Sequence, residues 1–381
     1  MSTRSTGGIV LFTCLAVVAL TLGPVVATSS ARAAIKTGLL LASVLPVGSS
    51  GFVETVTSPP IYEQIRYPVG STQIVADIYR PPGTDRHGAV VFVPGMTSDF
   101  YGSPIVQAST SLARVDIVVM IPHLDGIQRN RLLLEDVDAV VMGFQYLQSQ
   151  AFVDPSRVGL AGFCVGSSIA LVAAEDPRIN ERVAFVYTFG GYYDLIDYFV
   201  AIATSRTTYK GQEQPWGPGA MTITGFAGHI FDALDAPRDK EIISQSALRG
   251  NLQAESIPPG LSPLGRIAYG LLTTQDPDEV KVLMRQIPKE KLEPFIRLSP
   301  SSGIQNLRAP VYIMHDLGDT GVPYTESRKL ADSLPEGQRF YSEFTIFEHV
   351  YPTKPSNTFL FAEEVIKLYL HLYRVMEQLS P

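Results

Sequence analysis

Apolar and polar residues alternate over residues 61–83, on both sides of Val69-Gly70-Ser71. A strand that buries one face and exposes the other carries this period of two. A glycine between two such runs marks the turn of a hairpin. The pattern predicts an antiparallel β-hairpin at the edge of a sheet.

Further along the chain, continuous apolar segments of strand length recur between segments of helical spacing. The clearest helical segment is residues 131–148, and another, at residues 357–379, closes the chain. Strands that are apolar on both faces and alternate with helices indicate a parallel sheet with helices on both sides. The predicted class is therefore α/β, with a mostly parallel, doubly wound sheet. The apolar segments are residues 89–95, 116–122, 157–163, 182–189, 309–316 and 340–347.

The alternation of strand and helix stops over roughly residues 192–306. This stretch is rich in Pro and Gly and holds short amphipathic segments such as residues 278–287, without a strand signal of comparable quality. A bare loop of that length is improbable in a compact domain. We therefore expect a mostly helical cap inserted into a core made of residues 51–191 and 307–381.

The first 50 residues differ in kind from the rest of the chain. None of residues 5–31 is charged, and the apolar core at residues 9–22 is nearer the length of a signal peptide than that of a membrane span. Residues 31–33, Ala-Arg-Ala, offer a cleavage site, whereas a second apolar stretch at residues 37–48 fits a retained anchor or a short membrane hairpin. Both alternatives predict an exported protein, either secreted or held at a membrane by its N-terminal segment.

Charge and cysteine content narrow the range of partners. The chain has 381 residues and a net charge of −7 without a basic cluster, so it lacks the positive surface that binds a nucleic-acid backbone. Of the two cysteines, Cys14 lies in the N-terminal segment, which leaves Cys164 without a partner for an internal disulfide. No metal-type spacing of Cys and His occurs, and no cofactor is expected.

Residues 159–171, GLAGFCVGSSIAL, place Cys164 between two glycines at the junction of a predicted strand and helix. Such a sharp turn holds a nucleophile in a strained conformation at the carboxyl edge of a sheet. Side chains at Gly162 and Gly166 would collide with the neighbouring helix and strand. The amide of Val165 lies at the helix N-terminus, where it can stabilise an oxyanion. The segment predicts a nucleophilic Cys164; the alternative is a small buried apolar residue.

This turn resembles the nucleophile elbow of the α/β-hydrolase superfamily and, within it, of the dienelactone hydrolase-like group, which carries G-x-C-x-G. The resemblance extends over roughly residues 61–190 and 308–375, and it implies a Cys–Asp–His triad in that chain order. It places the acid at Asp319, in the turn GDTGVP ahead of a helix, and the histidine at His349, just after the last predicted strand. Asp316 stays open as the alternative acid.

The chemistry expected of this triad follows from the thiol. A free cysteine has a pKa of about 8.5, so a nearby His349 that accepts its proton would give an effective nucleophile at neutral pH. Asp319 would orient the imidazole, and the amides of Met96 and Val165 would form the oxyanion hole. Dienelactone hydrolases resemble a minimal, uncapped cytoplasmic version of this chain, so lactone specificity does not carry over.

The sequence predicts a hydrolase that cleaves an ester, lactone or thioester through an acyl-enzyme on Cys164. The alternatives are a peptidase or acyltransferase that uses the same triad, and a catalytically silent binding protein tethered to a membrane. The apolar cap beside an N-terminal membrane segment favours a hydrophobic small molecule as substrate. The expected acyl-binding side chains, for each of which packing of the cap is the alternative, are Phe226, Ile230, Phe231, Leu271, Leu272 and Leu283.

Overall fold

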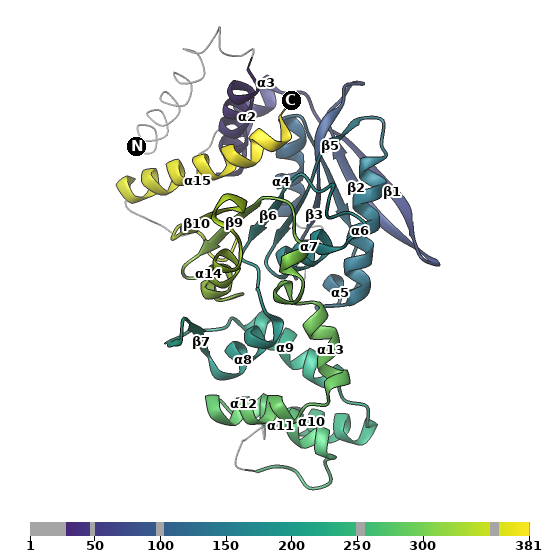
Figure 1. Ribbon diagram of the computed structural model, residues 1–381, viewed down its shortest axis with the longest axis vertical. Helices are drawn as coiled ribbons and strands as arrows, with labels where there is room; N and C mark the ends of the chain where they lie inside the picture. The colour runs from purple at the N-terminus through teal and green to yellow at the C-terminus, as the bar shows by residue number, and fades with distance from the viewer. Residues whose placement is uncertain (1–27, 46–49, 97–102, 249–255, 351–357, 381) are drawn as a thin grey trace, which may run out of the picture.

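An eight-stranded sheet forms the centre of the computed structural model, which describes residues 28–45, 50–96, 103–248, 256–350 and 358–380 (Figure 1). In spatial order its strands are β1-β2-β4-β3-β5-β6-β9-β10. β2 pairs antiparallel with β1 and β4, and the remaining pairs are parallel. The strands are β1 Ile61–Val69, β2 Thr72–Arg80, β3 His87–Val93, β4 Ile117–Pro122, β5 Val153–Phe163, β6 Val186–Phe189, β9 Val311–Asp316 and β10 Arg339–Phe344.

Each strand predicted from the hydrophobic pattern is present. The expected hairpin is β1 and β2, with Val69 opposite Thr72 at the turn, and β1 is an edge strand. The continuous apolar segments became the other six strands of the sheet, although β6 begins at Val186 instead of residue 182. The predicted α/β class with a mostly parallel sheet is confirmed.

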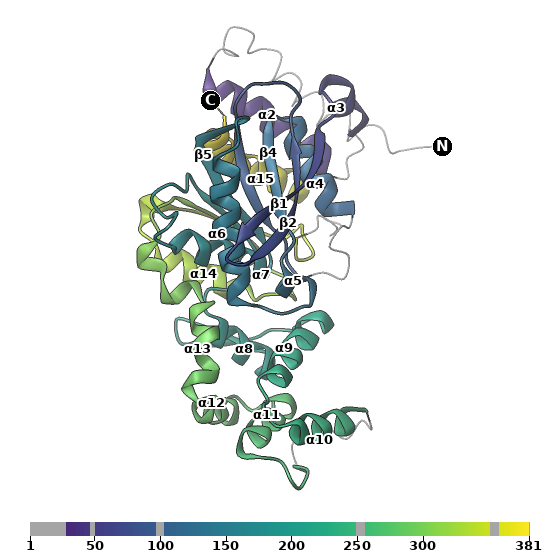
Figure 2. The ribbon, with the colours of Figure 1, turned by 90° about the vertical axis from the view of Figure 1, so that its right-hand side faces the viewer.

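Helices cover both faces of this sheet (Figures 1 and 2). Helices α2, α4 and α15 contact one another or the strands on one face, and α6 and α7 pack together on the other. The expected helices at residues 131–148 and 357–379 are α6 and α15. The bounds are α2 Ser29–Val44, α3 Ser50–Val56, α4 Ser103–Arg114, α5 Asp125–Gln128, α6 Leu134–Gln148, α7 Val165–Glu175, α14 Tyr324–Ser333, the 3-10 helix η4 Glu336–Gln338, and α15 Thr358–Leu379.

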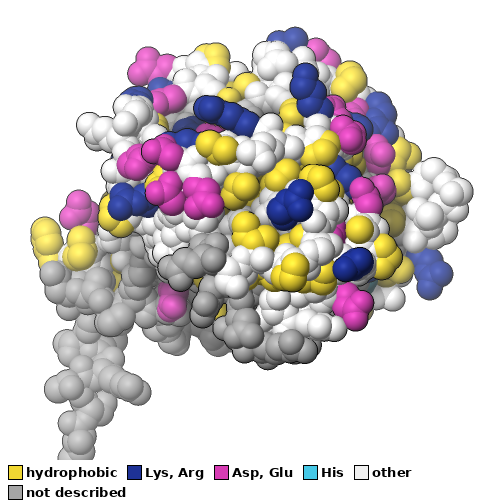
Figure 3. Space-filling view, turned by 90° about the horizontal axis from the view of Figure 1, so that it is seen from below, with side chains coloured by type: hydrophobic (Ala, Val, Ile, Leu, Met, Phe, Trp, Pro, Cys, Tyr) yellow, Lys and Arg dark blue, Asp and Glu magenta, His cyan; other side chains and the backbone are white. Residues whose placement is uncertain are grey.

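Between β6 and β9 the chain leaves the sheet and forms a separate helical layer at one end of the core (Figure 2). It contains a hairpin, β7 and β8, that the sequence pattern did not reveal because its strands, RTTY and QEQP, are largely polar. Basic and acidic side chains are interspersed on its outer surface (Figure 3). The elements are α8 Leu195–Thr204, β7 Arg206–Tyr209, β8 Gln212–Pro215, α9 Ala220–Asp232, α10 Pro237–Leu248, α11 Pro263–Thr273, α12 Pro277–Gln286, α13 Lys289–Arg297, and the 3-10 helices η2 Pro300–Ser302 and η3 Ile304–Asn306.

Helix α2 belongs to the folded core, although the sequence pattern assigned its residues to the N-terminal segment. Leu40 and Leu41 are buried, and the Tyr369 hydroxyl on α15 donates to the Ala34 carbonyl at 3.1 Å. The predicted cleavage site at residues 31–33 therefore lies inside a packed helix. The remainder of the predicted segment, residues 1–27 and 46–49, is outside the described residues. Within the described part of the chain, no helix is long and apolar enough to span a membrane.

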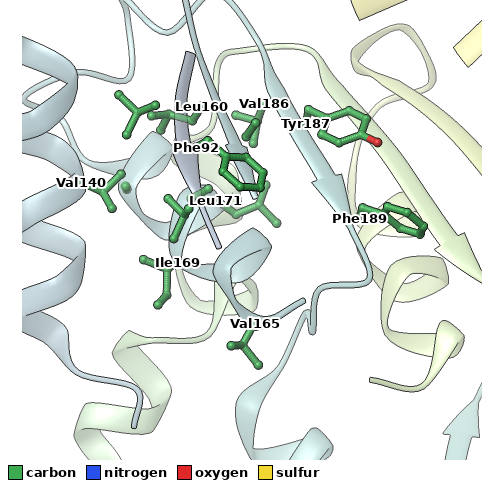
Figure 4. Packing of buried hydrophobic residues seen from close by; sticks show 14 of the residues in the cluster. Phe92, Val140, Leu160, Val165, Ile169, Leu171, Val186, Tyr187 and Phe189 are labelled. Atoms are coloured by element: carbon green, nitrogen blue, oxygen red, sulfur yellow. The ribbon is translucent and has the colours of Figure 1, made fainter. Parts of the chain in front are cut away.

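The helix that follows the cysteine is fixed by a dense apolar layer (Figure 4). Ile169 and Leu171 on α7 are fully buried together with Val140 on α6 and Leu160 on β5. An α-helix packed this closely cannot shift without opening cavities. The layer therefore sets the position of Cys164, which lies directly before α7.

Candidate active site

Cys164 stands at the sharp turn between β5 and α7, as predicted. Its backbone angles, φ 53° and ψ −139°, are rarely adopted by a residue with a side chain. Glycine is required on both sides: a Cβ on Gly166 would lie 2.3 Å from the carbonyl oxygen of Pro94, and one on Gly162 only 2.5 Å from the amide nitrogen of Ser167. The packed surroundings therefore hold Cys164 in a strained conformation, which is the geometry of a nucleophile elbow.

Two buried serines brace this turn. The Ser167 hydroxyl donates to the Gly162 carbonyl at 2.6 Å and accepts from the Phe189 amide at 3.0 Å. The Ser168 hydroxyl donates to the Tyr192 carbonyl at 2.7 Å. Both hydroxyls are thus hydrogen-bonded to backbone groups of neighbouring segments, so these two serines have a structural role.

The structure pairs His349 with Asp319. The Nδ1 atom of His349 lies 2.7 Å from Oδ2 and 2.8 Å from Oδ1 of Asp319. Oδ1 also accepts from the amides of Gly321 at 2.6 Å and Val322 at 3.1 Å. The alternative acid, Asp316, accepts from the amides of two other residues, Gly318 at 2.8 Å and Phe347 at 2.9 Å.

His315 is a second histidine on the same carboxylate, and the sequence analysis did not find it. Its Nε2 lies 3.3 Å from Oδ2 of Asp319 and 3.0 Å from the carbonyl oxygen of Val322. A carbonyl can only accept, so Nε2 carries the proton, and in the neutral ring Nδ1 accepts from Ser327 at 2.6 Å. The residue lies inside an apolar strand, where its sequence position gives no sign of this contact.

The electrostatics of the pair favour a charged carboxylate and a charged imidazole. Burial opposes both charges: alone it would raise the pKa of Asp319 and lower that of His349. His349 and then His315 outweigh burial at Asp319 and take its pKa well below the usual range. At His349, interactions with Cys164 and Asp319 outweigh burial and raise the pKa well above its ordinary value. Cys164 and Asp319 therefore both act on the same imidazole.

The two predicted oxyanion donors, Met96 and Val165, line one cavity with Cys164 and His349. The loop after β3 runs close across the thiol, since a Cβ on Gly95 would lie 2.5 Å from the Cβ of Cys164. Val165 is the first residue of α7, so its amide belongs to the unpaired donors of the helix N-terminus. This brings every residue of the predicted site to one place, while the role of each stays a prediction.

The cavity has a volume of about 320 Å³ and lies between the sheet edge and the inserted helices. Its walls from the inserted segment include Tyr198, Phe199 and Ile202 of α8, none of which the sequence analysis singled out. Of the six expected acyl-binding side chains, Phe226 alone lines the cavity as described. The expectation is wrong for the other five, which pack elsewhere in the inserted helices: Ile230, Phe231, Leu271, Leu272 and Leu283.

Two aromatic side chains of the inserted segment hold the acid-bearing turn. The indole N–H of Trp216 donates to the carbonyl of Asp319 at 2.7 Å, and the Tyr198 hydroxyl donates to the carbonyl of Gly321 at 2.5 Å. The donors and acceptors lie more than a hundred residues apart, so no local pattern could have found these contacts. Among the described residues, no group of three or more His, Cys, Asp or Glu side chains is arranged to hold a metal ion.

Comparison with known proteins agrees with this geometry. Residues 103–197, which include Cys164 and Val165, match the dienelactone hydrolase family. A Bradyrhizobium protein described as "Probable 2-oxo-3-(5-oxofuran-2-ylidene)propanoate lactonase" is 30% identical over 154 residues, which cover 36% of this chain and 55% of that protein. The match thus spans little more than half of the relative's length. Similarity to this family is thus shown for part of the chain.

Solved structures show the same fold at low identity. Acylaminoacyl peptidase from Pyrococcus horikoshii has a TM-score of 0.51 at 14% identity, and the match covers 84% of this chain and 43% of that chain. For 2,6-dihydroxy-pseudo-oxynicotine hydrolase the TM-score is 0.50 at 12% identity, with 99% and 90% covered. Together with the sheet topology, these similarities establish an α/β-hydrolase fold.

Proposed function

We propose that this protein hydrolyses a carboxylic ester, lactone or thioester, with Cys164 as the nucleophile. The observation that carries the proposal is the strained Cys164 beside an imidazole that Asp319 holds through Nδ1. Strained backbone persists only where the surroundings enforce it, and it gathers at functional sites. His349 shares this feature, with φ at 60°. Both conformations argue against a catalytically silent binding protein.

The reaction follows from the geometry in two steps. His349 takes the proton of Cys164, and Sγ attacks the carbonyl carbon while the amides of Met96 and Val165 stabilise the oxyanion. The intermediate collapses to a thioester on Cys164 as His349 protonates the leaving oxygen or sulfur. A water then gives a proton to His349 and attacks the thioester, and the returning proton restores the thiol. Asp319 stabilises the imidazolium in both steps.

The walls of the cavity support a small, mostly apolar substrate. They are dominated by apolar and aromatic side chains such as Phe163, Phe199 and Phe226. The lactonase relative is named for a lactone, so lactones belong among the candidate substrates together with open-chain esters. Export, with a signal peptide or a membrane anchor, is a further proposal, and it rests on the uncharged apolar residues 9–22 alone.

The test combines turnover with trapping of the covalent intermediate. The full chain should hydrolyse p-nitrophenyl butyrate, and rapid quenching followed by intact-mass measurement should show one butyryl adduct. Cys164→Ala should form no adduct, and its turnover should be at least about 10⁴-fold lower. The chain's other thiol offers a matched control, because Cys14→Ala should keep the activity and the adduct. Turnover retained in Cys164→Ala would remove Cys164 from the mechanism.

A further inference from the structure

A second cavity, of about 350 Å³, lies between one face of the sheet and the helices α2, α4 and α15. Its floor consists of side chains that face the same way on neighbouring strands: Phe92 is opposite Ala161, and Ala161 is opposite Tyr187. Protein interiors hold few voids larger than a water molecule, so a gap of this size under three helices requires a reason. Its lining further includes Leu40, Val44, Ala108, Ser109, Leu112, Leu368, Leu372, Val375 and Met376.

Small side chains create this space. Ala161 stands between two aromatic side chains on the sheet, and Ala108 and Ser109 face it from α4. Ala161 keeps 8% of its surface accessible although it belongs to a central strand, so the cavity reaches the side chains of the sheet itself. No charged residue is among the described residues that line it.

The polar side chains in this lining each have a partner within the protein. The Gln107 side chain donates to the Ser43 carbonyl at 3.1 Å, and the Ser109 hydroxyl donates to the Ile105 carbonyl at 2.9 Å. The Tyr187 hydroxyl lies 3.0 Å from the sulfur of Met314. A polar ligand would lose its hydrogen bonds to water here without replacement, so the cavity suits a hydrocarbon.

The cavity adjoins the candidate active site. Ile105, Phe163 and Val350 line both volumes. Phe163 directly precedes Cys164, and Val350 directly follows His349. A chain attached to Sγ of Cys164 that passes these three side chains would therefore enter the space under α2, α4 and α15.

We propose that this cavity binds the aliphatic chain of a medium- or long-chain acyl group during hydrolysis at Cys164. The proposal rests on the proposed function, since it needs an acyl group on that thiol. The acyl part stays bonded to Sγ through both steps, whereas a leaving group must depart, so a cavity that lies beneath helices suits the acyl part. A 150 Å³ apolar cavity holds benzene, so about 350 Å³ accommodates roughly a dozen carbon atoms.

The first measurement is independent of catalysis. Calorimetry measures dodecanoate binding to two full-length proteins, the single variant Cys164→Ala and the double variant that also carries Ala108→Phe. The second substitution places a ring inside the cavity. Thr110→Phe is the matched control, because Thr110 lies on the same helix but is not part of the lining. We expect dodecanoate to bind Cys164→Ala and its double variant with Thr110→Phe with equal affinity. The double variant with Ala108→Phe should bind dodecanoate at least about tenfold more weakly, because each buried methylene contributes about fourfold in affinity.

The second measurement uses p-nitrophenyl acetate and p-nitrophenyl dodecanoate with the reactive chain. In Ala108→Phe, kcat/KM for the dodecanoate ester should fall at least about tenfold while that for the acetate ester stays within about twofold. Equal effects on both esters would overturn the proposal. So would absence of dodecanoate binding together with a lower melting temperature of Ala108→Phe, because the chain itself would then fill the space. Binding that depends on Ala108 without any esterase activity would support the cavity as a hydrocarbon site and reject the proposed hydrolysis instead.

Discussion

Two buried carboxyl groups near opposite ends of helix α7 have pKa values that are shifted in opposite directions. Asp319 contacts His349 near the N-terminal end and is 3% exposed, and Glu175 is the last residue of the helix and is 6% exposed. Yet the pKa of Asp319 is held far below its ordinary value, whereas burial raises the pKa of Glu175 to about 9. Burial alone therefore does not decide whether an acid in this protein is charged.

The difference lies in the donors that each carboxyl group meets. Asp319 receives two backbone amides and contacts two histidines. Glu175 has an oxygen, Oε1, without a hydrogen-bond partner in the described structure, and it sits where the carbonyl end of α7 also disfavours negative charge. At the candidate active site the chain thus provides enough donors to keep a buried acid ionised.

Removing the charge of Asp319 should have the largest effect. Asp319→Asn keeps the shape of the side chain but turns one acceptor into a donor, so His349 loses its orientation and the stabilisation of its imidazolium. We expect kcat to fall by about 10³–10⁴-fold with p-nitrophenyl butyrate.

Asp316→Asn is the matched control for that variant. It changes an equally buried acid three residues away, whose partners are the amides of Gly318 and Phe347. It should lower the melting temperature and keep kcat within about tenfold. If Asp316→Asn loses activity while Asp319→Asn keeps it, Asp316 and not Asp319 is the acid that acts with His349.

Contacts of this site could be predicted from the sequence only where the contacting residues lie close together along the chain or follow clearly apolar strands. The strained turn at Cys164 is encoded within five residues, because the glycines that it needs are its near neighbours. His349 and Asp319 follow strands whose apolar pattern is clear. Trp216 and Tyr198 reach the acid turn from across the inserted segment, and only the folded chain shows those contacts.

An apolar stretch of sequence can belong to a membrane segment or to a protein core, and the pattern alone does not distinguish the two. Leu40 and Leu41 lie in an apolar stretch that also fits a membrane anchor or hairpin, but they are buried under α15. An apolar stretch measures only the tendency to leave water, which a protein core satisfies as well as a bilayer. The polar hairpin β7 and β8 is the opposite case, since a strand that carries polar side chains gives no such signal.

Neutralising Glu175 should change stability without changing activity. In the folded chain this carboxyl keeps its proton up to about pH 9, whereas in the unfolded chain it ionises near its ordinary pKa of 4.5. Because the folded state then binds more protons, the free energy of unfolding should fall as the pH rises from 4.5 to about 9.

Glu175→Gln removes this dependence. It should exceed the wild-type free energy of unfolding by a few kcal/mol at pH 9, with little difference at pH 5. Urea unfolding at pH 5, 7 and 9 measures it, with Glu181→Gln, an acid whose side chain is 78% exposed, as the control. Parallel pH profiles for wild type and Glu175→Gln would mean that Glu175 is ionised in the folded chain.

The smallest effect tests whether the inserted segment supports the acid turn. Trp216→Phe keeps an aromatic ring beside Tyr198, at a centroid distance of 6.3 Å in the wild type, but removes the N–H that donates to the Asp319 carbonyl. Loss of one such bond costs about 1 kcal/mol, so kcat should fall by about fivefold if the bond acts on the turn. The reduction should be absent in an Asp319→Asn background, because the variant would act through that carboxylate. Equal reductions in both backgrounds would show that Trp216 affects activity by a route other than the Asp319 carboxylate.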